Sequence, residues 1–126
     1  MNSKQLFCLI SLLGSMLGAQ VALASSAAVQ EMAGIMVHLE HYPSDAEKAK
    51  LKGIADSKAS TPHERVLASS IVNLKHKAAA EDRDKLKKVM DDAAAPAEVR
   101  ELAGIILNIN HMPSTEDKSK LKQMMK

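Results

Sequence analysis

The sequence has few cysteine and aromatic residues, and both shortages exclude classes of protein. Cys8 is the single cysteine among 126 residues, and it lies in the apparent leader Met1–Ala24. After removal of that leader the chain would form no disulfide and carry no thiol chemistry. Tyr42 is the one aromatic residue outside the leader. The stacking side chains that bind single-stranded nucleic acid are therefore missing.

Neither sign of charge dominates, and long apolar runs are absent after the leader. The chain has 17 basic and 15 acidic residues, and only Lys4 lies in the leader, which leaves 16 basic residues against 15 acidic ones. This near-neutral balance argues against a nucleic-acid binder. No later stretch approaches the roughly 18 apolar residues that a transmembrane helix needs, so we expect no membrane span.

The first 24 residues have the features of a secretory signal peptide. Lys4 supplies a positive charge, an apolar run follows over residues 6–17, and Ala22 and Ala24 stand where a signal peptidase reads small residues. We therefore predict export to the periplasm, with cleavage near Ala24–Ser25. The remainder, residues 25–126, is long enough for one small domain.

An internal repeat with a step of 35 residues extends through this domain. Matching residues recur at that step: His41, His76 and His111; Leu51, Leu86 and Leu121; Lys50, Lys85 and Lys120. A fixed period of this length is typical of helical repeat proteins. The pattern predicts three units, over about 29–61, 62–95 and 96–126.

Each unit contains two stretches with helical periodicity. In the first unit the first stretch covers Val29–Tyr42, where Pro43 ends it because proline disfavours helix in the residue before it. Ser44 is the expected N-cap of the second stretch, which extends to about Lys58. The third unit repeats the first stretch over Val99–Met112. We predict an all-α fold of three αα-hairpins, either stacked as a short solenoid or closed into a compact bundle.

The middle unit lacks the proline and the serine cap. It reads Lys77-Ala78-Ala79-Ala80 at that point, so local propensity favours one helix over about 63–94. The repeat favours a turn instead, because the flanking residues match the other units. We favour the turn, since tertiary context often overrides propensity.

The repeated histidines allow two interpretations. We expect His41, His76 and His111 in the last turn of each first helix, where a histidine caps carbonyls and meets the negative end of the helix dipole. The alternative is a copper or zinc site that also uses His38 and Met112. Packed helices lie ~8–10 Å apart, so the three imidazoles converge on one ion only if the repeats close into a ring. We favour the capping role.

Two surface features point to an interaction partner. Basic residues recur on the second stretches, which we interpret as a solvated face with an acidic surface as its partner: Lys50, Lys52, Lys85, Lys87, Lys120 and Lys122. Leu121, Met124 and Met125 form an apolar edge in the last unit. An exposed apolar edge favours contact with another protein or with a second copy of the chain, as in a homodimer.

Four methionines are expected in the interior. We expect Met32, Met36, Met90 and Met124 to face the core as flexible fillers.

Enzymatic classes lack their characteristic motifs. The sequence has no Gly-rich phosphate loop and no Gly-x-Ser-x-Gly elbow, so we predict neither catalysis nor a cofactor. The sequence favours a non-enzymatic exported helical-repeat protein that binds another protein or itself. A periplasmic metal-binding protein is the alternative.

Overall fold

The computed structural model describes residues 25–126, which contain six helices and no strand. The signal peptide predicted over Met1–Ala24 lies outside the described residues. The helices are α2 (Ala27–Val37), α3 (Asp45–Asp56), α4 (Pro62–Val72), α5 (Ala80–Asp91), α6 (Ala97–Asn108) and α7 (Thr115–Met124). The predicted all-α class is confirmed. Equivalent helices begin 35 residues apart, at 27, 62 and 97 and at 45, 80 and 115.

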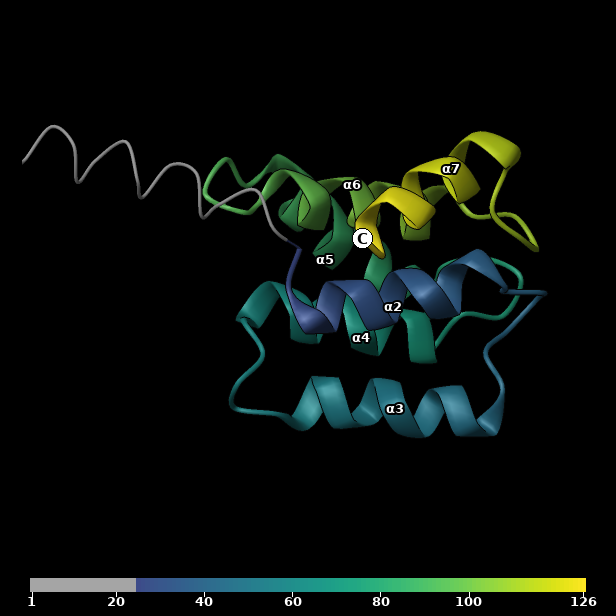
Figure 1. Cartoon of the computed structure of the whole chain (residues 1–126), viewed down its shortest axis with the longest axis horizontal. Coiled ribbons are helices and arrows are strands. Elements are labelled where there is room, and N and C mark those ends of the chain that lie inside the picture. The colour runs from purple at the N-terminus through teal and green to yellow at the C-terminus, as the bar shows by residue number, and fades with distance from the viewer. Residues whose placement is uncertain (1–24) are drawn as a thin grey trace, which may run out of the picture.

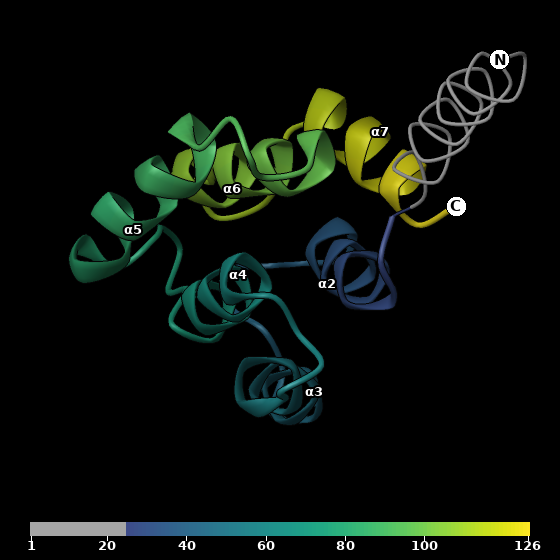
Figure 2. The ribbon, with the colours of Figure 1, turned by 90° about the vertical axis from the view of Figure 1, so that its left-hand side faces the viewer.

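The helices form a compact bundle in which α2, α4 and α6 lie inside and α3, α5 and α7 lie at three outer corners (Figures 1 and 2). Each outer helix packs mainly against the inner helix that follows it: α3 against α4 and α5 against α6. The last outer helix, α7, packs in the same way against α2, the first helix described. The arrangement is therefore closed, and α7 covers the face of α2 that an open array would leave bare.

The middle unit contains a turn, as the repeat predicts, and not one continuous helix. α4 ends at Val72 and α5 begins at Ala80. Ala78 occupies the position of Pro43 and Pro113, and all three residues are buried. Burial at this position fixes the connection even where proline is missing. Local helix propensity does not predict this turn because it takes no account of tertiary packing.

Side-chain caps start most of the helices. The predicted N-cap of α3 is confirmed, and it forms a capping box: Glu47 N–H donates to Ser44 Oγ at 3.2 Å, and Ser44 N–H donates to Glu47 Oε2 at 2.8 Å. Thr61 and Glu64 form the same box on α4. Glu64 is only 6% exposed and also accepts a 2.6 Å hydrogen bond from Ser26 Oγ, which ties the start of α2 to the start of α4.

The core consists of the facing sides of the inner helices and one stripe from each outer helix. Leu51, Leu86 and Leu121 anchor the outer helices and are fully buried. The predicted core positions of methionine are confirmed: three are buried and the fourth packs against the core from a partly buried position, namely Met32, Met36, Met124 and Met90.

Two helical glycines provide space for methionine side chains. A Cβ atom on Gly34 would lie 3.6 Å from Cε of Met125, and one on Gly104 would lie 3.4 Å from Cε of Met90. Met90 and Met125 are equivalent in the repeat, as are the two glycines. The pairs α7–α2 and α5–α6 therefore use the same methionine-over-glycine contact, which brings the helices close together.

Candidate metal centre

The repeated histidines lie in the connections between inner and outer helices. α2 ends at Val37 and α6 at Asn108, so the prediction that these helices extend to Tyr42 and Met112 is wrong. His41, His76 and His111 follow the helices instead of forming their last turns. Within residues 25–126, none of their rings donates a hydrogen bond to a helix carbonyl.

The backbone at these histidines has an uncommon conformation. Their φ angles are 69°, 68° and 71°, and in the described part of the chain no other residue, glycine included, has a positive φ. Tyr42 N–H donates to the Glu40 carbonyl at 2.8 Å, and Met112 N–H donates to the Asn110 carbonyl at 2.9 Å. A hydrogen bond of this direction across one central residue with positive φ defines the rare, strained form of the γ-turn at His41 and His111. At His76 the bond runs the other way, from Lys75 N–H to the Lys77 carbonyl at 3.3 Å. A non-glycine residue in this region costs on the order of 1–3 kcal/mol.

The three turns are joined by a closed ring of backbone hydrogen bonds. His76 N–H donates to the His41 carbonyl at 2.8 Å, and His111 N–H donates to the His76 carbonyl at 2.7 Å. His41 N–H completes the ring by donating to the His111 carbonyl at 2.7 Å. These residues are 35 or 70 positions apart in the sequence. The ring holds the three backbones around one approximate threefold axis.

The ring also gathers the three side chains, which we call the histidine triad. The imidazole centroids are 4.8, 4.9 and 5.5 Å apart. One ring nitrogen from each histidine lies within 4.8 Å of the other two, and Nδ1 of His41 is 3.1 Å from Nδ1 of His76. All three residues are exposed.

This spacing is close to that of a metal site. Nitrogens bound at ~2.1 Å to a tetrahedral zinc ion are separated by about 3.4 Å. The Nδ1 atoms of His41 and His76 already have a similar separation, and the 4.8 Å limit for the three ligand atoms exceeds the tetrahedral separation by about 1.4 Å. A small rotation of these exposed side chains brings the nitrogens to that separation.

Two contacts prepare the imidazoles for a cation. Nδ1 of His111 lies 2.9 Å from Oδ1 of Asn110, so a donated Nδ1–H leaves Nε2 free as a ligand atom. A ligating imidazole nitrogen carries no proton, so a bound metal ion would replace the 3.1 Å contact between Nδ1 of His41 and Nδ1 of His76 with a bond from each nitrogen to the ion. The inner helices α2, α4 and α6 also end nearby, so the negative ends of their dipoles lie on this side of the molecule.

The other predicted ligands lie beside the triad. His38 is the exposed C-cap of α2 and lines a shallow surface pocket with His41, Tyr42 and Glu47. Met112 follows His111 and is exposed. Only His41, His76 and His111 come together as a three-residue cluster of ligating side chains among residues 25–126.

The predicted interaction residues are dispersed. The repeated lysines are on the outer helices α3, α5 and α7: Lys50, Lys52, Lys85, Lys87, Lys120 and Lys122. Because these helices occupy separate corners of the bundle (Figure 2), the lysines form three patches and not one row. Lys120 pairs with Glu116 at 3.3 Å and Glu101 at 3.7 Å, and the hydrogen bond that Lys120 donates to Glu116 raises the pKa of this lysine.

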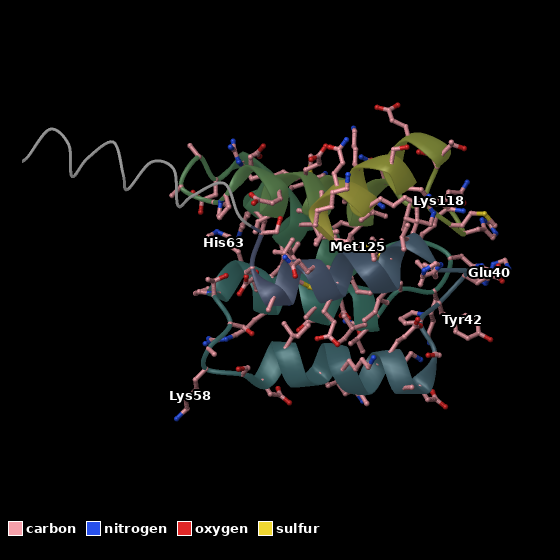
Figure 3. The ribbon with its side chains drawn as sticks, in the orientation of Figure 1. Glu40, Tyr42, Lys58, His63, Lys118 and Met125 are labelled. Atoms are coloured by element: carbon pink, nitrogen blue, oxygen red, sulfur yellow. The ribbon has the colours of Figure 1, made fainter. Side chains whose placement is uncertain are left out.

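The terminal apolar edge is mostly covered. Leu121 and Met124 are 0% and 4% exposed, because α7 packs against α2. They are not available as surface contacts. Met125 is 43% exposed and keeps part of its side chain against Gly34 (Figure 3).

A second histidine contact lies at the opposite end of the bundle, which sequence reasoning did not identify. Glu40 and Tyr42 mark the triad end in Figure 3, and His63 lies at the other end. Nε2 of His63 is 2.8 Å from Oδ2 of Asp92. The Ala94 N–H and the His63 ring both bond to this carboxylate and lower the pKa of Asp92. The pair connects the start of α4 to the end of α5.

Comparison with protein-family models, with curated proteins and with solved structures gave no match. Among the described helices, none combines the length and the apolar character that crossing a membrane requires.

Proposed function

We propose that this protein binds one first-row transition-metal ion at its histidine triad. The observation that supports this proposal is the convergence of three exposed imidazoles, each on a strained turn, with ring nitrogens within 4.8 Å of one another. Imidazole nitrogen suits zinc, copper, iron and nickel ions, whereas calcium and magnesium prefer oxygen ligands. Zn(II) and Cu(II) are the first candidates.

The conformation of the turns is a second argument for a chemical role. Glycine adopts a φ near +70° without the steric cost that other residues meet. The backbone ring uses only N–H and C=O groups, so glycine would preserve it. All three positions nevertheless carry histidine. Strained backbone of this kind clusters at functional sites, where the side chain has a use that offsets the strain.

The proposed role is ion binding and not catalysis. The three histidines are exposed at the end of the bundle, and the pocket that His41 lines is shallow, so water reaches the site. Three ligands from one side leave the remaining coordination positions open to solvent. We also propose that binding takes place after export, in the periplasm, in keeping with the signal sequence predicted over Met1–Ala24.

Calorimetric titration of the purified chain with Zn(II) and Cu(II) tests this proposal. In buffer without chelator, we expect one metal ion bound per chain at saturation. The triple variant H41G/H76G/H111G should lose binding at least 100-fold while keeping its helical circular dichroism, because glycine is compatible with the turns.

His63→Ala is the matched control, since it removes an imidazole at the other end of the bundle. It should keep the wild-type affinity. Absence of tight binding by the wild type, or equal binding by the triple glycine variant, would overturn the proposal.

A further inference from the structure

We infer that the face carrying the triad binds a second copy of the chain through one shared metal ion. This inference rests on the proposed metal binding. Three imidazoles from one chain occupy one face of the ion, and an ion that accepts six nitrogens has three positions left on its opposite face. A second triad, facing the first along the same axis, supplies ligands of the right number and symmetry.

The shape of the face permits this approach. Each histidine is the central residue of its turn, and the residues on both sides of it are exposed, over residues 40–42, 75–77 and 110–112. Tyr42 and Met112 are 59% and 46% exposed, and they are two of the three large apolar side chains exposed in the described region. Exposed apolar groups around a ligand cluster favour contact with another protein surface.

The charges around the triad identify that surface as a second copy. The first connection carries Glu40, the second carries Lys75 and Lys77, and the third has the uncharged Asn110 and Met112. A twofold axis perpendicular to the threefold axis places the first connection of one copy opposite the second connection of the other. The third connection then faces its own counterpart.

This arrangement makes the face self-complementary. Glu40 of each copy meets Lys75 and Lys77 of the other, so the same attraction occurs twice, as an interface between identical surfaces requires. Met112 meets Met112 of the second copy, which buries apolar surface on both. The charge pairs select the orientation, because exposed ion pairs contribute little to affinity.

The ion must supply most of the affinity. The face presents three residues from each of three connections, nine in all, whereas a stable interface uses about 20–30 residues on each side. Association without metal should therefore be weak. The dimer is expected only when an ion bridges the two triads.

Native mass spectrometry and light scattering with Ni(II), an ion that accepts six nitrogen ligands, test the inference. We expect a monomer in chelator and a dimer with one ion per two chains when Ni(II) is limiting. Glu40→Lys should still bind Ni(II) but should raise the dissociation constant of the Ni(II) dimer by about tenfold, because like charges then oppose each other at two symmetric contacts. The variant E40K/K75E/K77E reverses both sides and should restore the dimer.

Lys58→Glu is the control for a charge reversal, since Lys58 lies away from the triad end (Figure 3). It should dimerise as the wild type does. A wild-type monomer that holds one Ni(II), or a chain that takes up no Ni(II), would overturn the shared-ion inference and leave the proposed metal binding to the Zn(II) and Cu(II) titration. Absence of uptake of all three ions would overturn both. A dimer in chelator, or a Glu40→Lys dimer that dissociates no more readily than the wild-type dimer with Ni(II), would also refute the arrangement.

Discussion

Replacing the triad with glycine or with alanine separates the cost of the turns from the chemistry of the side chains. We compare H41G/H76G/H111G with H41A/H76A/H111A in metal-free buffer containing chelator, because a bound ligand would stabilise the folded state. Both variants lack the imidazoles. They differ only in how well their residues adopt φ angles of 68–71°.

The expected difference in stability follows from two opposing effects. A non-glycine residue in the left-handed region costs roughly 1–2 kcal/mol. Glycine loses more backbone entropy on folding, which costs roughly 0.5–1 kcal/mol relative to alanine. The net advantage of glycine is about 0.7 kcal/mol per turn, or about 2 kcal/mol for three turns. In a domain of this size, that corresponds to a Tm difference of roughly 8–16 °C.

Far-UV circular dichroism during thermal and urea unfolding measures this difference. His38 offers a matched control, because it is exposed with a φ of −104°, where glycine has no steric advantage. His38→Gly should be no more stable than His38→Ala. If the triple glycine variant is no more stable than the triple alanine variant, the strain assigned to the turns is wrong.

Three further substitutions test the caps, the helix interiors and the ion pair. Ala79 is the N-cap of α5 and makes no side-chain cap, so Ala79→Ser should stabilise the fold by about 1 kcal/mol in urea unfolding; an unchanged midpoint would contradict this. Gly53 lies inside α3, and nothing is within 4 Å of a Cβ placed there. Gly53→Ala should therefore raise the free energy of unfolding by about 1 kcal/mol, and a decrease would show an unseen clash. The pKa of Asp92 lies below its ordinary value of 3.8 because the Ala94 N–H and then His63 bond to the carboxylate. A carboxylate with a lowered pKa stabilises the folded state at pH values above its ordinary pKa, and this stabilisation is lost as the pH falls through the pKa of the folded state. The loss of stability in Asp92→Asn should therefore shrink between neutral pH and about pH 3. A loss that is the same at both pH values would refute the assignment.

Local sequence patterns determined the helical class and most helix starts. Ser44 as an N-cap predicted the start of α3, and the helical periodicity predicted two helices in the first unit. These features act within one or two turns of helix, so a single stretch of sequence contains all the information. The repeat also predicted the turn between α4 and α5 where local propensity predicted a continuous helix.

The step of 35 residues indicated that the three histidines are equivalent, but it did not indicate that they meet. Local propensity placed His41 inside a helix. The structure ends α2 at Val37 and gives His41 a left-handed backbone conformation. The reason is tertiary: Leu39 is buried, and the His41 N–H bonds to the carbonyl of His111, 70 residues away.

Closure of the bundle made the candidate site. An open array would separate neighbouring histidines by about the 8–10 Å of a helix spacing. Packing of α7 against α2 instead lets the third connection reach the first, and the backbone ring brings the imidazole centroids to within 5.5 Å of one another. The sequence determined which residues are equivalent, while only tertiary structure decided that they converge, because the hydrogen bonds that join them connect residues far apart in the chain.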